Sequence, residues 1–160
     1  MDNKKLQEEK KRLVELLGVY FEHDRQTPPL AGRIKSILII NGEQGTTFDE
    51  IMSDLGASKS TVSTHLQSLI AQGDVSYFTK SGDRKRYFAM SPGYISRKIH
   101  SFISLWKNEI EIHKQILDYK TQFNKANPKQ FISLAKHEQS VIFLSKSIAF
   151  FEQENNKYTE

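Results

Sequence analysis

The 160-residue sequence predicts a mainly α-helical protein that contains one small β-hairpin. Apolar residues recur at every third or fourth position in several separate segments, which is typical of amphipathic helices resting on a core. One region differs: residues 75–79 (VSYFT) and 85–90 (KRYFAM) are rich in aromatic and β-branched residues, and they flank the turn sequence KSGDR. Two such runs around a Gly-Asp turn indicate a β-hairpin.

Two helices are predicted before the first glycine-containing turn. The first covers roughly residues 3–25, and its apolar side consists of Leu6, Leu13, Leu17 and Tyr20. Pro28 and Pro29 interrupt this pattern, because proline disfavours a continuing helix. The second helix follows them and ends at Gly42, with Leu30, Ile34, Ile37 and Leu38 on one side.

A short third helix and a fourth helix follow, joined by a tight turn. Thr47 has Glu50 three residues later, the spacing of a capping box that begins a helix. Gly56 ends the third helix and suits a left-handed backbone position. Ser58 is the expected N-cap of the fourth helix, which covers about residues 58–72 and buries Val62, Leu66, Leu69 and Ile70.

The opposite side of the fourth helix has an unusual composition. Its polar residues are Ser60, Thr61, Ser63, Thr64, His65, Gln67 and Ser68, and no acid lies between Leu55 and Gly73. Serine and threonine are poor helix formers, because their hydroxyls compete for backbone hydrogen bonds. A face that only meets water would favour Glu, Lys and Arg. The composition therefore indicates a face that contacts a negatively charged partner.

The predicted hairpin carries its charge at the tip. The basic residues there are Lys80, Arg84, Lys85 and Arg86. Gly82 provides the positive φ that the turn requires. Asp83 is expected to stabilise the turn and to hold Arg84 or Arg86 in an ion pair.

Two further helices complete the chain. Ser91 as N-cap and Pro92 in the first turn begin a long helix, which the segment NKANPK (124–129) ends. The last helix is expected from about Pro128 to Gln153 and is apolar on several sides. A helix of that kind requires partners on several sides.

Helix, glycine turn, helix and basic hairpin together form a winged helix-turn-helix. In this motif the second helix enters the DNA major groove, where short hydroxyls, Gln and His can contact base edges. The hairpin is then the wing, and Arg84 is the residue expected in the minor groove. The predicted parts are an N-terminal helix (1–27), the winged helix-turn-helix domain (28–91) and a C-terminal helical region (92–160).

Residues 28–90 resemble the MarR-type winged-helix regulators, and most closely their GbsR-type branch. The resemblance is carried by PPLAGRIKSILII (28–40), FDEIMSDLGASKSTVSTHLQSLIAQGDV (48–75) and SGDRKRYF (81–88). It implies a homodimer clasped by the N- and C-terminal helices. It also places Asp83 and Arg84 in the wing's Asp-Arg position, and Arg33 near the DNA backbone or the dimer seam. The GbsR-type branch is associated with osmoprotectant uptake or synthesis.

The sequence therefore predicts a sequence-specific transcriptional regulator that binds double-stranded DNA as a homodimer on an inverted-repeat operator. The predicted DNA-binding residues are Arg33, Ser58, Lys59, Ser60, Thr61, Ser63, Thr64, His65, Gln67, Lys80, Arg84, Lys85 and Arg86, with Gly82 and Asp83 in the wing turn. The alternative is a winged-helix module that binds another protein and not DNA, since fold does not fix function.

Several other classes are not supported. The chain has no cysteine, no phosphate-binding loop, no nucleophile motif and no helical metal motif, so we expect no enzyme activity, cofactor or metal. No apolar run is long enough for a membrane span, and we expect a cytoplasmic protein. Whether a small-molecule effector modulates DNA binding is left open. The aromatic residues Tyr20, Phe21, Phe102, Trp106, Tyr119 and Phe123 could line its pocket, but core packing is the favoured interpretation.

Overall fold

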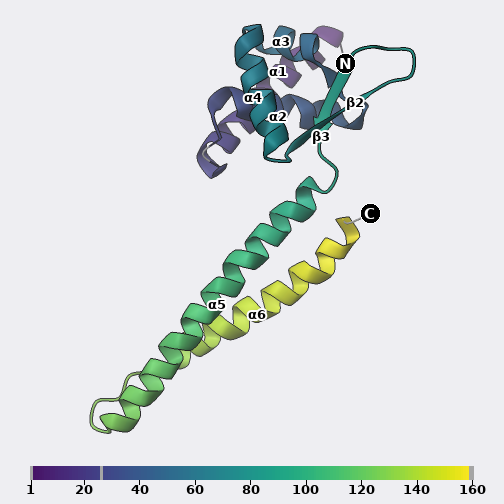
Figure 1. Ribbon diagram of the computed structural model, residues 1–160. Coiled ribbons are helices and arrows are strands. Elements are labelled where there is room, and N and C mark those ends of the chain that lie inside the picture. The colour runs from purple at the N-terminus through teal and green to yellow at the C-terminus, as the bar shows by residue number, and fades with distance from the viewer. Residues whose placement is uncertain (1, 26, 159–160) are drawn as a thin grey trace. The chain divides into compact units, whose positions relative to one another are not determined.

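The computed structural model describes residues 2–25 and 27–158, and the chain divides into two compact units, residues 1–92 and 93–160 (Figure 1). The first unit contains helices α1 (Asn3–Arg25), α2 (Pro29–Asn41), α3 (Phe48–Leu55) and α4 (Lys59–Ala71), a short 3-10 turn (Gly42–Gln44), and strands β1 (Thr46–Thr47), β2 (Val75–Thr79) and β3 (Arg86–Met90). The second contains the long helix α5 (Tyr94–Ala126), helix α6 (Ala135–Asn155) and a final 3-10 turn (Asn156–Tyr158). The predicted fold class, mainly α with a small β wing, is confirmed.

The three strands form one antiparallel sheet in the order β1-β3-β2. The predicted hairpin is present, with Val75 opposite Met90 and Thr79 opposite Arg86. Strand β1 was not predicted, and it pairs Thr46 with Phe88 on the other edge of β3. A two-residue strand is too short to show an alternating pattern, so its pairing partner determines it.

The core of the first unit lies between helices α2, α3 and α4 and the sheet. It is formed by Ala31, Ile34, Leu38, Ile51, Val62, Leu66, Leu69, Val75 and Phe88. Since α4 buries Val62, Leu66 and Leu69, its polar side must face away from this core.

The caps predicted for α3 and α4 are confirmed. Thr47 and Glu50 form a reciprocal capping box at the start of α3, and Gly56 ends α3 with a left-handed φ of 59°. The Ser58 hydroxyl accepts a hydrogen bond from the Thr61 amide at the start of α4. These local contacts fix the turn that separates α3 from α4.

The predicted apolar side of α1 is only partly correct. Leu6 and Tyr20 are 51% and 49% exposed, whereas Val14, Gly18 and Phe21 are buried. The reason is a close crossing with α2: a Cβ atom on Gly32 would lie 3.1 Å from the Gly18 carbonyl oxygen. Two apolar sides are present on α1, and this crossing selects the one that is buried.

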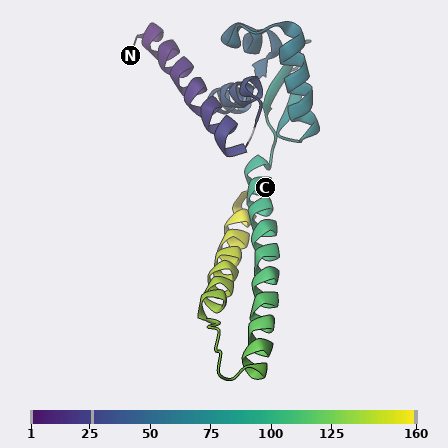
Figure 2. The ribbon, with the colours of Figure 1, turned by 90° about the vertical axis from the view of Figure 1, so that its left-hand side faces the viewer.

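Helices α5 and α6 of the second unit run side by side (Figures 1 and 2). Their shared core consists of Ile103, Ile110, Leu144 and Ile148, with Ile99, Trp106, Val141 and Phe151 packed around it. The Trp106 ring meets Phe151 edge-on, with 5.4 Å between the ring centroids. No helix in the described part of the chain is long and apolar enough to cross a membrane.

Both predicted helix starts in this region are wrong. Helix α5 begins at Tyr94 after Gly93, which has a φ of 71°, and not at Ser91 and Pro92. Ser91 instead donates its amide to the Asp74 carbonyl at 2.9 Å and so extends the sheet ladder. Helix α6 begins at Ala135 and not near residue 128, because the Asn124 side chain bonds both the amide and the carbonyl of Ile132 and so holds that segment outside a helix.

A pair of histidines joins α5 to α6. The Nδ1 atoms of His113 and His137 are 2.8 Å apart, which is hydrogen-bonding distance. The ring centroids are 5.0 Å apart and the ring planes are tilted by 50°. One Nδ1 must carry a hydrogen and the other must accept it. Burial, together with Lys120 and His113, lowers the pKa of His137 below the ordinary histidine value.

This pair predicts a pH-dependent stability. Because the folded pKa of His137 is lowered, the unfolded chain binds its proton more readily, and the free energy of unfolding should fall as the pH drops below about 6.5. Thermal unfolding followed by the fluorescence of Trp106, the single tryptophan, would measure this. The variant His137→Gln should weaken the pH dependence, whereas the exposed control His23→Gln should not. Equal pH dependence in all three proteins would contradict the assignment.

Candidate DNA-binding surface

The outward side of α4 is the first part of the candidate surface. Residues Ser58, Lys59, Ser60, Thr61, Thr64 and Gln67 are exposed, while Ser63 and His65 are half-buried. We refer to these eight residues as the α4 face. All are predicted site residues, and they lie at exposed or half-buried positions of α4 and its N-cap, outside the buried stripe of Val62, Leu66 and Leu69. The sole ionisable residues on this face are Lys59 and His65, so it presents no acid.

Hydroxyl groups on the α4 face bond mainly to one another and to their own helix. The Ser58 oxygen lies 2.7 Å from the Thr61 hydroxyl and 3.1 Å from the Ser60 hydroxyl. The Thr64 hydroxyl donates to the Ser60 carbonyl at 3.0 Å. Hydroxyl hydrogens rotate, so these groups can exchange local bonds for bonds to an incoming acceptor or donor. The face is thus rich in short groups of either hydrogen-bonding polarity.

A groove connects the α4 face with the base of the wing. It has a volume of about 330 Å³ and is lined by Phe48 and Asp49 at the start of α3, Ser63 and Gln67 of α4, and Lys85 and Arg86 of the wing, among others. A second hollow lies at the N-terminal end of α4 and is lined by Phe48, Ser58, Lys59, Ser60 and Ser63. The polar side of α4 is therefore continuous with the basic hairpin.

The wing turn is held by Asp83. The Asp83 amide donates to the Lys80 carbonyl at 3.0 Å, and its carboxylate accepts from the Lys85 amide at 2.9 Å and from the Tyr87 hydroxyl at 2.6 Å. These bonds lower the pKa of the Asp83 carboxyl, the Tyr87 bond most, and the same contact raises the pKa of Tyr87. The predicted turn role of Asp83 is confirmed, as is the positive φ of Gly82, at 78°.

The ion pair predicted between Asp83 and Arg84 or Arg86 is wrong. Both oxygens of the carboxylate are occupied by Tyr87 and the Lys85 amide, and the Arg86 guanidinium lies over the Tyr77 ring, 4.7 Å from its centroid. Lys80 lies over the Tyr87 ring at 3.8 Å. Arg84 is exposed at the tip. The aromatic residues of the strands therefore support two wing cations, and the Asp83 carboxylate bonds to the Lys85 amide and the Tyr87 hydroxyl rather than to Arg84.

Tyr87 was not among the predicted site residues, although it organises the wing. The variant Tyr87→Phe should lose the bond to Asp83 while it keeps the ring stacked on Phe78, 5.9 Å away between centroids. Hydrogen exchange at the Lys85 amide should then become faster by about tenfold. The free energy of unfolding should change by no more than about 1.5 kcal/mol, the typical contribution of one hydrogen bond. The control Tyr94→Phe lies outside the wing. Unchanged exchange at Lys85 would show that Tyr87 does not hold the turn.

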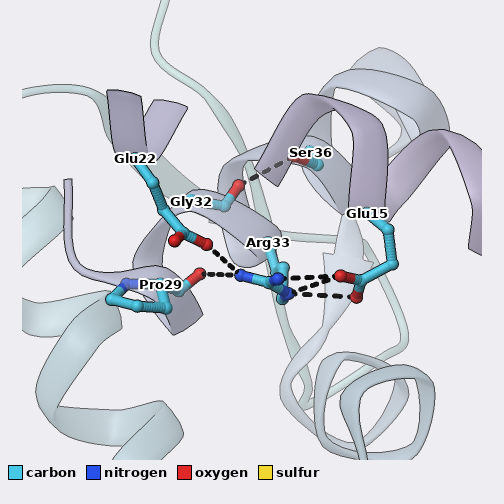
Figure 3. Close-up of polar contacts among 6 residues, drawn as sticks. All are labelled: Glu15, Glu22, Pro29, Gly32, Arg33 and Ser36. Carbon is cyan, nitrogen blue, oxygen red and sulfur yellow. Dashed lines mark hydrogen bonds and ion pairs between the residues drawn. The ribbon is translucent and has the colours of Figure 1, made fainter. Parts of the chain in front are cut away.

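Arg33 lies between two acids of α1 (Figure 3). Its guanidinium donates to both carboxylate oxygens of Glu15, at 2.7–3.0 Å, to Glu22, and to the Pro29 carbonyl at 3.0 Å. Hydrogen bonds to Glu15 and then Glu22 raise the pKa of Arg33. Because two acids of α1 already hold this side chain, the structure assigns it to the α1–α2 crossing rather than to a free DNA contact.

The described residues also give no indication of a metal-binding site. No three His, Asp or Glu side chains are grouped there so as to hold a metal ion. His65 is the one histidine of α4, and the four others in the sequence belong to α1, α5 and α6.

Comparisons with known proteins agree with the fold. The family model described as "Bacterial regulatory protein, arsR family" matches residues 33–77, from α2 to β2. The HTH-type transcriptional regulator MmpR5 of Mycobacterium tuberculosis is 34% identical over 79 residues, which cover 49% of this chain and 47% of that protein. The chain thus matches about half the length of this curated relative.

One solved structure is similar over nearly its whole length. It is a crystal structure of a transcriptional regulator with a TM-score of 0.53 and 21% sequence identity, and the alignment covers 94% of this chain and 98% of that one. At this identity the likeness concerns the fold. The chain therefore has a winged helix-turn-helix fold of the kind found in transcriptional regulators.

Proposed function

We propose that the protein is a transcriptional regulator that binds double-stranded DNA in a sequence-specific manner. The observation that carries the proposal is the acid-free α4 face, which continues through the groove into a basic wing. DNA is densely negative, so a surface that docks on it should carry more cations than acids. Among the residues that line the groove, Asp49 is the single acid, and Lys85 and Arg86 are cations. The names of the matched relative and of the similar structure support the same function.

In this proposal α4 enters the major groove. Its N-terminal end, with Lys59 and the hydroxyls of Ser58 and Ser60, suits phosphate contacts, because the helix dipole and the free amides both favour anions. Further along the helix, Thr61, Ser63, Thr64, His65 and Gln67 supply the donors, acceptors and methyl groups that read base edges. The wing, residues 80–86, lies over the adjacent minor groove with Arg84 inserted.

We further propose a homodimer. Large apolar side chains remain exposed in each unit, among them Leu16 of α1 at 58%, Leu105 of α5 at 65% and Phe143 of α6 at 66%. Single exposed apolar residues are common, but whole helix sides of them indicate contact with another chain. Two copies would present two α4 helices to an inverted-repeat operator with half-sites about 10 base pairs apart. The MarR-type and GbsR-type resemblance belongs to this proposal.

An effector would regulate such a dimer if it changed the separation of the two α4 helices. This step is part of the proposal, and the compounds to screen are small organic cations and aromatic molecules, because exposed aromatic rings such as Tyr119 and Phe102 recognise both. The test is release of the protein from an operator complex.

Fluorescence anisotropy of a labelled duplex tests the central proposal. The duplex comes from the DNA upstream of the protein's own gene, a scrambled duplex is the control, and both are titrated at several salt concentrations. Tight binding to the first duplex, weak binding to the second and steep weakening with salt are expected of a sequence-specific regulator. Binding to neither duplex at low salt would overturn the proposal and would favour the protein-binding module instead.

A further inference from the structure

Lys35 is a buried cation that the DNA-binding surface does not use. It lies on α2 and is 4% exposed, and its ammonium is 2.6 Å from a carboxylate oxygen of Asp74. On another side the ammonium faces the ring of Phe21 on α1, 4.7 Å from the ring centroid. One buried charge therefore contacts α1, α2 and the segment that follows α4.

Asp74 occupies the junction between α4 and the wing. Its amide donates to the Leu69 carbonyl at 3.0 Å and so closes the last turn of α4. Its carbonyl accepts from the Ser91 amide at 2.9 Å, just beyond the end of β3. The backbone of Asp74 thus joins the C-terminal end of α4 to the sheet, while its side chain joins the same point to α2.

Stability alone does not account for this pair. Removing two charges from water costs about as much as their attraction returns, and well-packed apolar residues often replace a buried pair without loss. What a buried pair contributes is a specific arrangement of the two segments, because only one placement of them brings the carboxylate to the ammonium. We propose that Lys35 and Asp74 are positioning residues that fix the C-terminal end of α4 on α2, and that Phe21 extends this link to α1. The consequence for DNA reading rests on the proposed function.

A charge-conserving double variant tests the inference. Lys35→Met with Asp74→Asn removes both charges of the pair and keeps the net charge, so general attraction to DNA is unchanged. The matched control is Lys10→Met with Asp54→Asn, which removes a 2.7 Å ion pair between α1 and α3. The measurements are amide hydrogen exchange at Gly73, Asp74 and Ser91 and the ratio of affinities for the operator and the scrambled duplex.

If the pair positions α4, exchange at these three amides should be faster by about tenfold in the Lys35 and Asp74 double variant than in the parent or the control. The affinity ratio should fall by about tenfold as well, with binding to the scrambled duplex unchanged. Parent-like exchange overturns the positioning role whether or not the protein binds DNA. Faster exchange with a parent-like affinity ratio overturns the consequence for DNA reading. A parent that does not distinguish the two duplexes overturns the proposed function, and exchange still decides the positioning role.

Should the double variant fail to fold, Asp74→Glu replaces it. This change keeps both charges but lengthens the carboxylate arm by one methylene, so the pair can form only if the end of α4 moves. The expected result is a folded protein with faster exchange at Gly73. Parent-like exchange in this variant would overturn the proposal in the same way.

Discussion

Replacing Leu66 with alanine is expected to lower the free energy of unfolding of the first unit by about 2–5 kcal/mol. The Leu66 side chain is 2% exposed and belongs to the core formed with α2, α3 and the sheet. Truncation removes apolar contact and leaves a cavity that the surrounding helices can fill only in part. Because α4 carries the proposed DNA-reading residues on its other side, operator binding should weaken together with stability.

Urea unfolding followed by far-ultraviolet circular dichroism would measure the loss. Ser68→Ala is the matched control, because Ser68 is exposed on the same helix and alanine favours helix, so its effect should stay within about 0.5 kcal/mol. A loss below about 1 kcal/mol for Leu66→Ala would show that the core does not depend on this side of α4, contrary to the burial pattern.

The parts of the fold that could be predicted are those with local causes. The α3 capping box and the Gly56 C-cap are each determined by residues within one helical turn, and both are confirmed. The start of α6 could not be predicted in this way, because Asn124 holds the Ile132 backbone from the preceding helix. Which side of α1 is buried likewise depends on where α2 crosses it at Gly32.

The candidate site shows the same division. The α4 face was recognisable because its Ser and Thr content conflicts with the helix propensity expected of a solvated side, and such conflicts mark residues kept for another purpose. The contacts that support the site were not recognisable. Lys35 and Asp74 are 39 positions apart in the sequence. From the sequence Tyr87 is predicted only as a strand residue, whereas in the structure its hydroxyl donates to the Asp83 carboxylate across the turn.

The contacts around the wing distinguish Arg84 from the other wing cations. Lys80 and Arg86 each lie over a tyrosine ring, and the Lys85 amide is bound by Asp83, whereas Arg84 is exposed at the tip without such a contact in the described structure. An exposed guanidinium at the tip of the turn is suited to a narrow minor groove, where the negative potential is strongest.

Arg84→Ala is therefore expected to weaken operator binding by about tenfold and to lower the slope of affinity against salt by about one ion. Protein stability should change by less than about 0.5 kcal/mol, because the side chain is exposed. Lys129→Ala removes the same charge from an exposed position between α5 and α6 and is the matched control. Anisotropy titrations at several salt concentrations separate a lost contact from a lost net charge. If both variants weaken binding equally, the wing contributes only general charge. If Arg84→Ala alone does so, its guanidinium contacts the DNA.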